Sequence, residues 1–227
     1  IHAAFAGTSS HMENQTIARH VALSCLTLGV KRVVVVSSGS VYGEKEGPIM
    51  ESDPCLPDTA YGRSCFFVEN IFRQTLRSAS LITARLFYPY GPAQPPERLI
   101  KRLAVHIAGR KEIPLRPAVS GRHGKPKINP VYIDDVAEAL YRLAGIAGVN
   151  PGKPMLVNIG GQETLSIKEL AGKIGRLLGM QCLFTLDPKG RLARNFYCST
   201  RFLSNLIDFV PSVNLERGLA LTVGSAV

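Results

Sequence analysis

The sequence predicts an α/β fold built around a mostly parallel β-sheet, and three observations support this prediction. Short runs of β-branched residues alternate with amphipathic stretches along the chain. The run VVVV at residues 33–36 lacks the polar alternation of a half-exposed strand, as expected where helices cover both faces of a parallel sheet. Glycines and capping residues stand where the stretches end. These features together indicate helices layered on a parallel sheet.

The first half of the chain predicts two helices and two strands. Residues 14–28 place apolar side chains at helical spacing, and Gly29 follows as a stop signal. The valines at 33–36 form the first strand. Residues 61–77 form the second helix, and LITARLF at 81–87 forms the second strand.

The second half continues the alternation. INPVYI at 128–133 reads as extended, and DDVAEALYRLA at 134–144 reads as a helix whose first aspartate can cap it. MLVNIGG at 155–161 returns to strand. Ser166 and Glu169 then have the S-x-x-E spacing of a capping box, which opens the next predicted helix.

Composition excludes several classes of protein. The hydrophobic share of 45% is that of a globular chain, and no purely apolar run exceeds four residues, far short of the roughly 20 that span a membrane. Without a visible export signal at the first residues, we expect a cytoplasmic protein with no membrane partner. Five scattered cysteines and five histidines without paired spacing argue against a disulfide scaffold and against a metal site.

The net charge of +10 predicts an anionic partner, and much of this charge lies at residues 110–127. That stretch carries no aromatic residue for base stacking, so we expect no nucleic-acid partner. A phosphorylated small ligand or a solvated basic loop fits the pattern better.

Candidate chemistry lies just after the predicted strands, because ligands of an open parallel sheet bind at the carboxyl ends of its strands. SSGSVYG at 37–43 follows the first strand, and YPYGP at 88–92 follows the second. Tyr61 begins the helix between them. A serine hydroxyl and a tyrosine hydroxyl brought together can act on one carbonyl or alcohol.

Five segments in this order resemble a known family: VVVVSSGSVYG, PDTAYG, RLFYPYGPAQ, NPVYIDDVAEAL and NIGGQETLSIKELA. The set is similar to the extended short-chain dehydrogenase/reductase superfamily, in particular to the NAD-dependent epimerase/dehydratase group that acts on nucleotide sugars. The resemblance runs from the first residue to about Gly179. It implies a Rossmann-like parallel sheet with a smaller C-terminal α/β substrate-binding lobe, and hydride transfer to and from nicotinamide.

The resemblance also implies a division of the chain. Residues 1–92 and about 128–148 would form the remainder of the NAD(P)-binding Rossmann domain, and about 93–127 and 149–227 the substrate-binding lobe. The family's G-x-x-G-x-x-G fingerprint, which brings the pyrophosphate to a helix N-terminus, is absent. IHAA at 1–4 matches the family's fourth strand, so we expect the N-terminal strands to be missing and NAD or NADP to bind this chain weakly or not at all.

Individual residues take roles from the resemblance. Ser38 would hydrogen-bond the reacting substrate oxygen, and Tyr61 would be the catalytic base that exchanges the substrate hydroxyl proton. The positions matched to the cofactor site are Ala3, Ala4, Tyr61, Tyr88 and Pro89. The positions matched to the substrate site are Ser38, Ser40, Tyr88 and Lys127. Ser40 also reads as a turn residue, and Tyr88 stands where the family often has asparagine.

One departure from the family pattern weakens the predicted catalysis. The family's Tyr-x-x-x-Lys reads YGRSC here, so Cys65 occupies the lysine position. That lysine lowers the pKa of the tyrosine and hydrogen-bonds the nicotinamide ribose, and a cysteine does neither. A tyrosine with a pKa of about 10 is phenolate in roughly one molecule in a thousand at pH 7. We therefore expect a weak or inert enzyme.

Three functions remain open from the sequence. The first is an NAD(P)-dependent epimerase or dehydratase acting on a nucleotide sugar, truncated or impaired. The second is a catalytically inactive Rossmann-fold module for binding or interaction, and the third is a short-chain reductase of a non-sugar carbonyl. The resemblance also leaves a homodimer open, through the helices near Asn14 and Tyr61.

Overall fold

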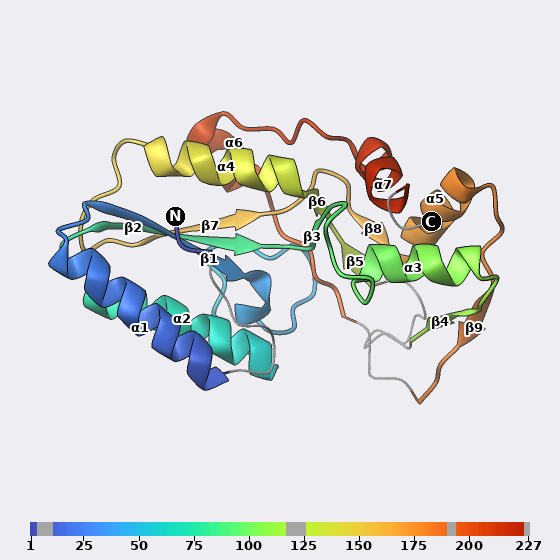
Figure 1. Ribbon diagram of the computed structural model, residues 1–227, viewed down its shortest axis with the longest axis horizontal. Coiled ribbons are helices and arrows are strands. Elements are labelled where there is room, and N and C mark those ends of the chain that lie inside the picture. The colour runs from blue at the N-terminus through green and yellow to red at the C-terminus, as the bar shows by residue number, and fades with distance from the viewer. Residues whose placement is uncertain (4–10, 117–125, 190–193, 225–227) are drawn as a thin grey trace. The chain divides into compact units, whose positions relative to one another are not determined.

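The computed structural model describes residues 1–3, 11–116, 126–189 and 194–224, and it separates into two compact units (Figure 1). Each unit is assembled from three separate stretches of the chain. Unit 1 comprises Ile1–Phe87, Val136–Ile159 and Cys198–Phe209, and unit 2 comprises Tyr88–Asp135, Gly160–Tyr197 and Val210–Val227. Within the described residues, no helix is long and apolar enough to cross a membrane.

Unit 1 is built on a parallel sheet. Its strands, in spatial order, are β1 (Arg32–Ser38), β2 (Ser80–Leu86) and β7 (Met155–Ile159). The valines of β1 lie opposite β2, with Val35 beside Thr83, and His2 pairs with Val35 on the other side of β1, also in parallel. The parallel sheet predicted from the valine run is confirmed.

Helices cover both faces of this sheet, which explains why β1 and β2 have so little polar alternation. In Figure 1, α1 (His11–Thr27) and α2 (Ala60–Thr75) lie side by side on one face, and α4 (Ile133–Gly145) and α6 (Arg201–Ile207) on the other. Small residues permit the close packing of α1 on α2, since Ala18 and Ala22 are fully buried there among Val33, Val35 and Phe72. A short 3-10 turn, η1 (Gly39–Val41), follows β1 directly.

Unit 2 contains three helices and short strand pairs. The helices are α3 (Leu99–Ala108), α5 (Ile167–Leu178) and α7 (Leu215–Val223). The parallel pairs are β3 (Pro89–Tyr90) with β6 (Val131–Tyr132) and β4 (Ile113–Leu115) with β9 (Phe184–Leu186); the antiparallel pair is β5 (Lys127–Ile128) with β8 (Leu165–Ser166). One apolar core joins the helices to these strands.

The predicted capping box of α5 is confirmed. The Ser166 hydroxyl oxygen accepts a hydrogen bond from the Glu169 N–H (3.2 Å), and the Glu169 carboxylate accepts one from the Ser166 N–H (2.7 Å). The helix ends at Gly179, whose φ of 64° is the left-handed conformation that glycine adopts without strain.

Two expectations about the second half of the chain differ from the structure. Residues 149–227 were expected to lie in the substrate lobe, yet β7 pairs with β2, and both β7 and α6 belong to unit 1. The first aspartate of DDVAEALYRLA was expected to cap a helix, but α4 begins at Ile133 and so already includes it. The next aspartate, Asp135, is 2% exposed and accepts hydrogen bonds from the N–H groups of Ser212 (2.7 Å) and Val213 (3.1 Å), so it anchors that segment within unit 2.

Candidate functional site

Ser38 ends β1 at the carboxyl edge of the unit 1 sheet. It is the N-cap of η1, and its hydroxyl oxygen accepts a hydrogen bond from the Ser40 N–H (3.2 Å). The Ser38 hydroxyl also lies 3.2 Å from the Ser40 hydroxyl, to which it donates. The sequence SSGSV therefore makes a tight strand-to-turn junction with two hydroxyl groups in contact.

Tyr61 lies in the first turn of α2, next to that junction. The Thr59 hydroxyl caps the helix by accepting a hydrogen bond from the Gly62 N–H (3.0 Å). A Cβ atom at Gly62 would collide with the backbone carbonyl oxygen of Ser40, so only glycine allows the helix to approach η1 this closely. Gly62 of α2 thus approaches the carbonyl oxygen of Ser40 in η1. Tyr61 precedes Gly62 in α2, and Ser38 is the N-cap of η1, so the two residues matched to catalysis lie on the two elements that meet at this contact inside unit 1.

Cys65 lies one turn after Tyr61 and is buried. Burial raises the pKa of the Cys65 thiol to about 11, although a hydrogen bond with Tyr61 acts in the opposite direction. The thiol is therefore neutral at physiological pH. The position where the family pattern has a lysine carries no positive charge.

A buried ion pair lies one further turn along α2. The Glu69 carboxylate accepts hydrogen bonds from Arg85 of β2, from Nε (3.0 Å) and from Nη2 (2.7 Å), and from the Ser37 hydroxyl of β1 (2.6 Å). Arg85 is 2% exposed, so this bidentate pair is shielded from water. The pair connects α2, the helix that carries Tyr61, to β2, and the Ser37 hydrogen bond connects Glu69 to β1, the strand that ends at Ser38.

The network extends to the third strand. The Arg85 guanidinium lies 4.5 Å above the centre of the Tyr42 ring, and the Tyr42 hydroxyl donates to Asn158 Oδ1 of β7 (2.9 Å). Burial raises the pKa of Tyr42 to about 12, with the neighbouring Arg85 opposing the shift. Sequence reasoning missed this network, although a charged residue within the apolar strand LITARLF was a usable signal.

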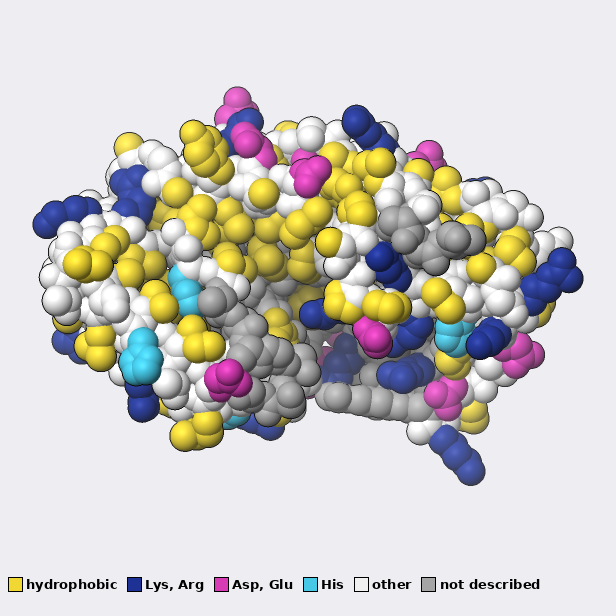
Figure 2. Space-filling model, viewed as in Figure 1, with side chains coloured by type: hydrophobic (Ala, Val, Ile, Leu, Met, Phe, Trp, Pro, Cys, Tyr) yellow, Lys and Arg dark blue, Asp and Glu magenta, His cyan; other side chains and the backbone are white. Residues whose placement is uncertain are grey.

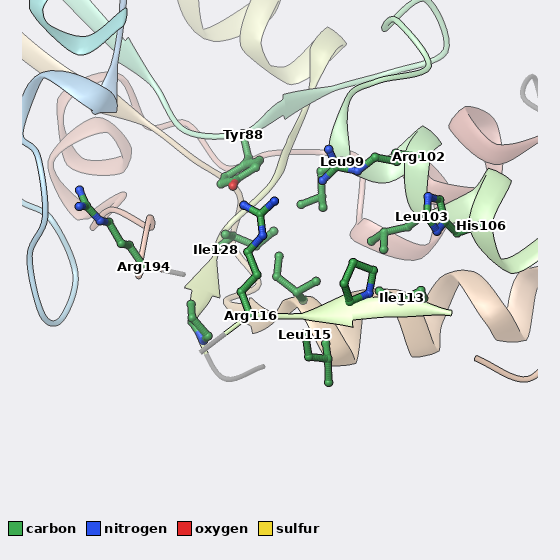
Figure 3. A pocket seen from close by; sticks show the side chains of 13 residues that line it. Tyr88, Leu99, Arg102, Leu103, His106, Ile113, Leu115, Arg116, Ile128 and Arg194 are labelled. Carbon is green, nitrogen blue, oxygen red and sulfur yellow. The ribbon is translucent and has the colours of Figure 1, made fainter. Parts of the chain in front are cut away.

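Unit 2 holds a pocket of about 420 Å³ with basic and apolar walls (Figure 3). Three guanidinium groups belong to it: Arg102 of α3, Arg116 directly after β4, and Arg194. Tyr88 and His106 add polar atoms. The aliphatic lining consists of Leu99, Leu103, Ile113, Leu115, Ile128 and Ile167. Arg116 belongs to the basic stretch at residues 110–127 for which the sequence predicted an anionic partner. Arg102 and Arg194 were not singled out, because they are far from that stretch in the sequence.

Tyr88 is the predicted site residue that the pocket contains. Burial raises the pKa of its phenol, and the positive charges of Arg102 and Arg98 partly offset this. The backbone of Tyr88 has a φ of 47°, in the left-handed region that a bulky residue rarely adopts. Its ring packs edge-on against Phe196, with the ring centres 5.5 Å apart.

The remaining matched residues lie elsewhere. The Lys127 side chain is exposed on β5 and is not part of the pocket lining, while its backbone N–H donates to Asn195 Oδ1 (2.8 Å). Pro89 is exposed on β3, and Ala3 is exposed beside His2. Ala4 lies outside the described residues. Among the described residues, no group of three or more His, Cys, Asp or Glu side chains could hold a metal ion.

Comparisons with known proteins place these features in a family. The family model described as "NAD dependent epimerase/dehydratase family" matches residues 4–160. An uncharacterized UDP-glucose epimerase of Bacillus subtilis is 27% identical over 206 residues, covering 86% of this chain and 60% of the relative. A dTDP-glucose 4,6-dehydratase of Streptomyces griseus is 31% identical over 203 residues, covering 86% of this chain and 58% of the relative. The chain therefore spans about three-fifths of the length of these relatives.

Solved structures share the fold. MoeE5 in complex with UDP-glucuronic acid and NAD matches with a TM-score of 0.82 at 24% identity, covering 99% of this chain and 77% of MoeE5. The dTDP-glucose 4,6-dehydratase of Bacillus anthracis in complex with NAD matches with a TM-score of 0.81 at 23% identity, covering 97% of this chain and 70% of the other. The architecture is thus that of Rossmann-fold epimerases and dehydratases, and this chain belongs to the NAD-dependent epimerase/dehydratase family.

Proposed function

We propose that this protein binds a nucleotide sugar through the pocket of unit 2 and is an impaired member of the epimerase/dehydratase enzymes. The observation that carries the proposal is the set of three arginines on a pocket that is otherwise lined mostly by apolar side chains. A nucleoside diphosphate sugar joins a doubly charged diphosphate to a flat base, so it needs cationic donors beside apolar surface.

The distribution of charge supports an anionic ligand for unit 2. Of the 27 Lys and Arg residues of the chain, 16 belong to unit 2, against 8 of the 17 Asp and Glu residues. Figure 2 shows Lys and Arg side chains gathered around α3 and β4, near the pocket residues. This excess of positive charge attracts a diphosphate. Hydrogen bonds from Arg102, Arg116 and Arg194 then fix the position of the diphosphate.

The relatives support the substrate class. MoeE5 was solved with UDP-glucuronic acid and also with UDP-glucose. The curated relatives include enzymes named for UDP-glucose and for dTDP-glucose. Nucleoside diphosphate sugars are therefore the ligands to test first.

Unit 1 supplies two hydroxyl groups for sugar chemistry. In this proposal the Ser38 hydroxyl hydrogen-bonds the reacting sugar oxygen, and Tyr61 takes or returns the hydroxyl proton. With a neutral thiol at Cys65, the hydrogen-bonded neighbour of Tyr61 adds no positive charge that would favour the phenolate. Proton abstraction by Tyr61 is therefore slow.

The nicotinamide cofactor would supply the hydride acceptor when bound. In the family, a lysine one turn after the tyrosine hydrogen-bonds the nicotinamide ribose. The Cys65 thiol at this position is buried and uncharged, so it does not fit the ribose of NAD or NADP in the same way. Weak or absent cofactor binding by this chain follows from that mismatch.

Isothermal titration calorimetry with UDP-glucose and dTDP-glucose tests the proposal. One of the two should bind, and Arg102→Gln should weaken it about tenfold or more, since hydrogen bonds to charged groups contribute about 1.5–3 kcal/mol. The matched control is Arg176→Gln, which removes an exposed arginine of α5 outside the pocket. Equal losses in both variants, or no binding by the unmodified chain, would contradict the proposal.

A catalytically inactive binding module is the second candidate, and the neutral Cys65 favours it. Cys65→Lys should raise NAD-dependent turnover of the bound nucleotide sugar if catalysis is merely impaired, while Cys65→Ala should not. A folded Cys65→Lys protein, checked by circular dichroism, that shows no gain would point to the inactive module. A reductase of a non-sugar carbonyl predicts no nucleotide-sugar binding.

A homodimer is part of the proposal. Exposed apolar side chains on α1 include Met12, Leu23 and Leu26, and a second copy of this helix surface would cover them. Sedimentation equilibrium should give twice the 24.6 kDa chain mass. A purely monomeric species at micromolar concentration would count against this assembly.

A further inference from the structure

Tyr88 holds a backbone conformation that costs energy for its residue type. Among the described residues, the non-glycine residues with positive φ are Tyr88, Arg110 and Asp208. Aspartate tolerates the left-handed region through local hydrogen bonds, whereas an aromatic residue gains nothing from it locally. Strain of this kind persists only where the surroundings impose it, and it is concentrated at ligand sites.

The surroundings of Tyr88 fix both its backbone and its ring. Its carbonyl oxygen accepts a hydrogen bond from the Val131 N–H (3.2 Å), and its ring rests edge-on against Phe196. The side chain lines the unit 2 pocket, and in Figure 3 its hydroxyl points toward the guanidinium of Arg116 from the opposite wall. The left-handed turn thus directs a phenol into the pocket.

The pocket offers many donors to a ligand. The guanidinium groups of Arg102, Arg116 and Arg194 can only donate hydrogen bonds. Burial raises the pKa of Tyr88, so its hydroxyl is a protonated donor at neutral pH. The hydroxyl hydrogen of Tyr88 cannot be donated to an arginine, which has no acceptor, so an acceptor lying between Tyr88 and Arg116 is a suitable partner for it. A phosphate oxygen is such an acceptor, and it can accept from both sides at once.

We propose that Tyr88 is a specificity-determining residue that donates its phenolic hydrogen bond to a phosphate oxygen of the ligand in the unit 2 pocket. This inference rests on the proposed nucleotide-sugar binding and deepens it. The arginines supply charge from flexible side chains, whereas Tyr88 supplies one neutral donor whose direction is fixed by the strained backbone and by Phe196. Tyr88 therefore selects ligands by the position of the phosphate.

Tyr88→Phe is the variant that isolates the hydroxyl, because it keeps the ring, the packing on Phe196 and the backbone strain. The matched control is Tyr90→Phe, two residues along the same segment. The Tyr90 hydroxyl faces Gly218 of α7, where an added Cβ atom would collide with it, and Tyr90 is not part of the pocket lining. Both variants remove one phenolic oxygen from the same unit.

Binding of UDP and of uridine to the 227-residue chain should be measured by calorimetry and, for weak binding, by saturation-transfer NMR. Tyr88→Phe should weaken UDP binding about tenfold and leave uridine binding unchanged, because uridine has no phosphate. Tyr90→Phe should change neither. Thermal unfolding of both variants checks that they are folded.

Three other outcomes are informative. Unchanged UDP binding by Tyr88→Phe would overturn the inference, and so would equal losses for UDP and uridine, which would mean that the ring only shapes the pocket. Failure of the unmodified chain to bind UDP, UDP-glucose or dTDP-glucose would instead overturn the proposed function, and with it the ligand that the Tyr88 inference requires.

Discussion

The two units of this protein use charged residues in opposite ways. In unit 1 the charges are nearly balanced, with 11 basic and 9 acidic residues, and Arg85 is buried in a bidentate pair with Glu69. In unit 2 basic residues are in twofold excess, and three arginines surround a pocket. The buried pair of unit 1 holds a helix and a strand together, whereas the arginines of unit 2 place positive charge around a pocket. Buried charge fixes internal geometry in unit 1, and positive charge gathers at a pocket in unit 2, where we propose that a ligand binds.

The largest expected effect comes from breaking the buried pair of unit 1. Glu69→Gln leaves the Arg85 charge buried without its counter-charge, which costs about 3–5 kcal/mol of the free energy of unfolding. The exposed pair between Arg142 and Glu138 is the matched control, since Glu138→Gln should cost only about 0.3–0.5 kcal/mol. Urea unfolding measures both. A loss below about 1 kcal/mol for Glu69→Gln would contradict this role of the pair.

A glycine in one helix of each unit gives the next comparison. Gly62→Ala in α2 should destabilise unit 1 by about 1–3 kcal/mol, because the new Cβ atom meets the rigid backbone of Ser40. Gly172→Ala in α5 should instead stabilise unit 2 by about 0.5–1 kcal/mol, since the nearest atom is 4.0 Å away at the end of the Arg176 side chain. Thermal unfolding should show shifts of opposite sign. No destabilisation by Gly62→Ala would show that Gly62 is not required for close packing.

The smallest effect concerns the capping box of α5 and depends on pH. Hydrogen bonds from Ser166 hold the pKa of Glu169 below its usual 4.5. A carboxyl group whose pKa is lowered by folding stabilises the folded state at pH values above its pKa in the unfolded chain. This contribution is lost as the pH falls through the pKa of the folded state. The unfolding free energies of the unmodified protein and Glu169→Gln should thus differ at pH 7 and converge below pH 4.5. A constant difference across this range would contradict the assignment.

Local patterns predicted the elements of this protein better than the contacts between them. The valine run, the start of the helix at DTAYG and the capping box of α5 each depend on a short stretch of sequence, and each lies where it was predicted. The family resemblance brought Ser38 and Tyr61 to attention, and the close approach at Gly62 puts their elements in contact.

Features made by distant residues could not be predicted in this way. Glu69 reads as a solvated position on a helix until β2 is known to lie beneath it. The pocket arginines come from three unrelated segments, and no periodicity links them. Lys127 was matched to the substrate site, whereas its side chain is exposed on β5 and does not line the pocket. The division implied by the resemblance groups residues 149–227 together, whereas β7 pairs with β2 and belongs to unit 1, because strand pairing rather than position in the chain decides the unit.

The chain passes five times between the two units, since each is assembled from three stretches. No single genetic crossover can therefore replace one unit and leave the other whole. A gene fusion that joined the first 87 residues to a foreign remainder would lose β7 and α6 along with the pocket. With the role that we propose for Tyr88, ligand preference changes by point substitution at such a position, but it cannot be exchanged as a cassette.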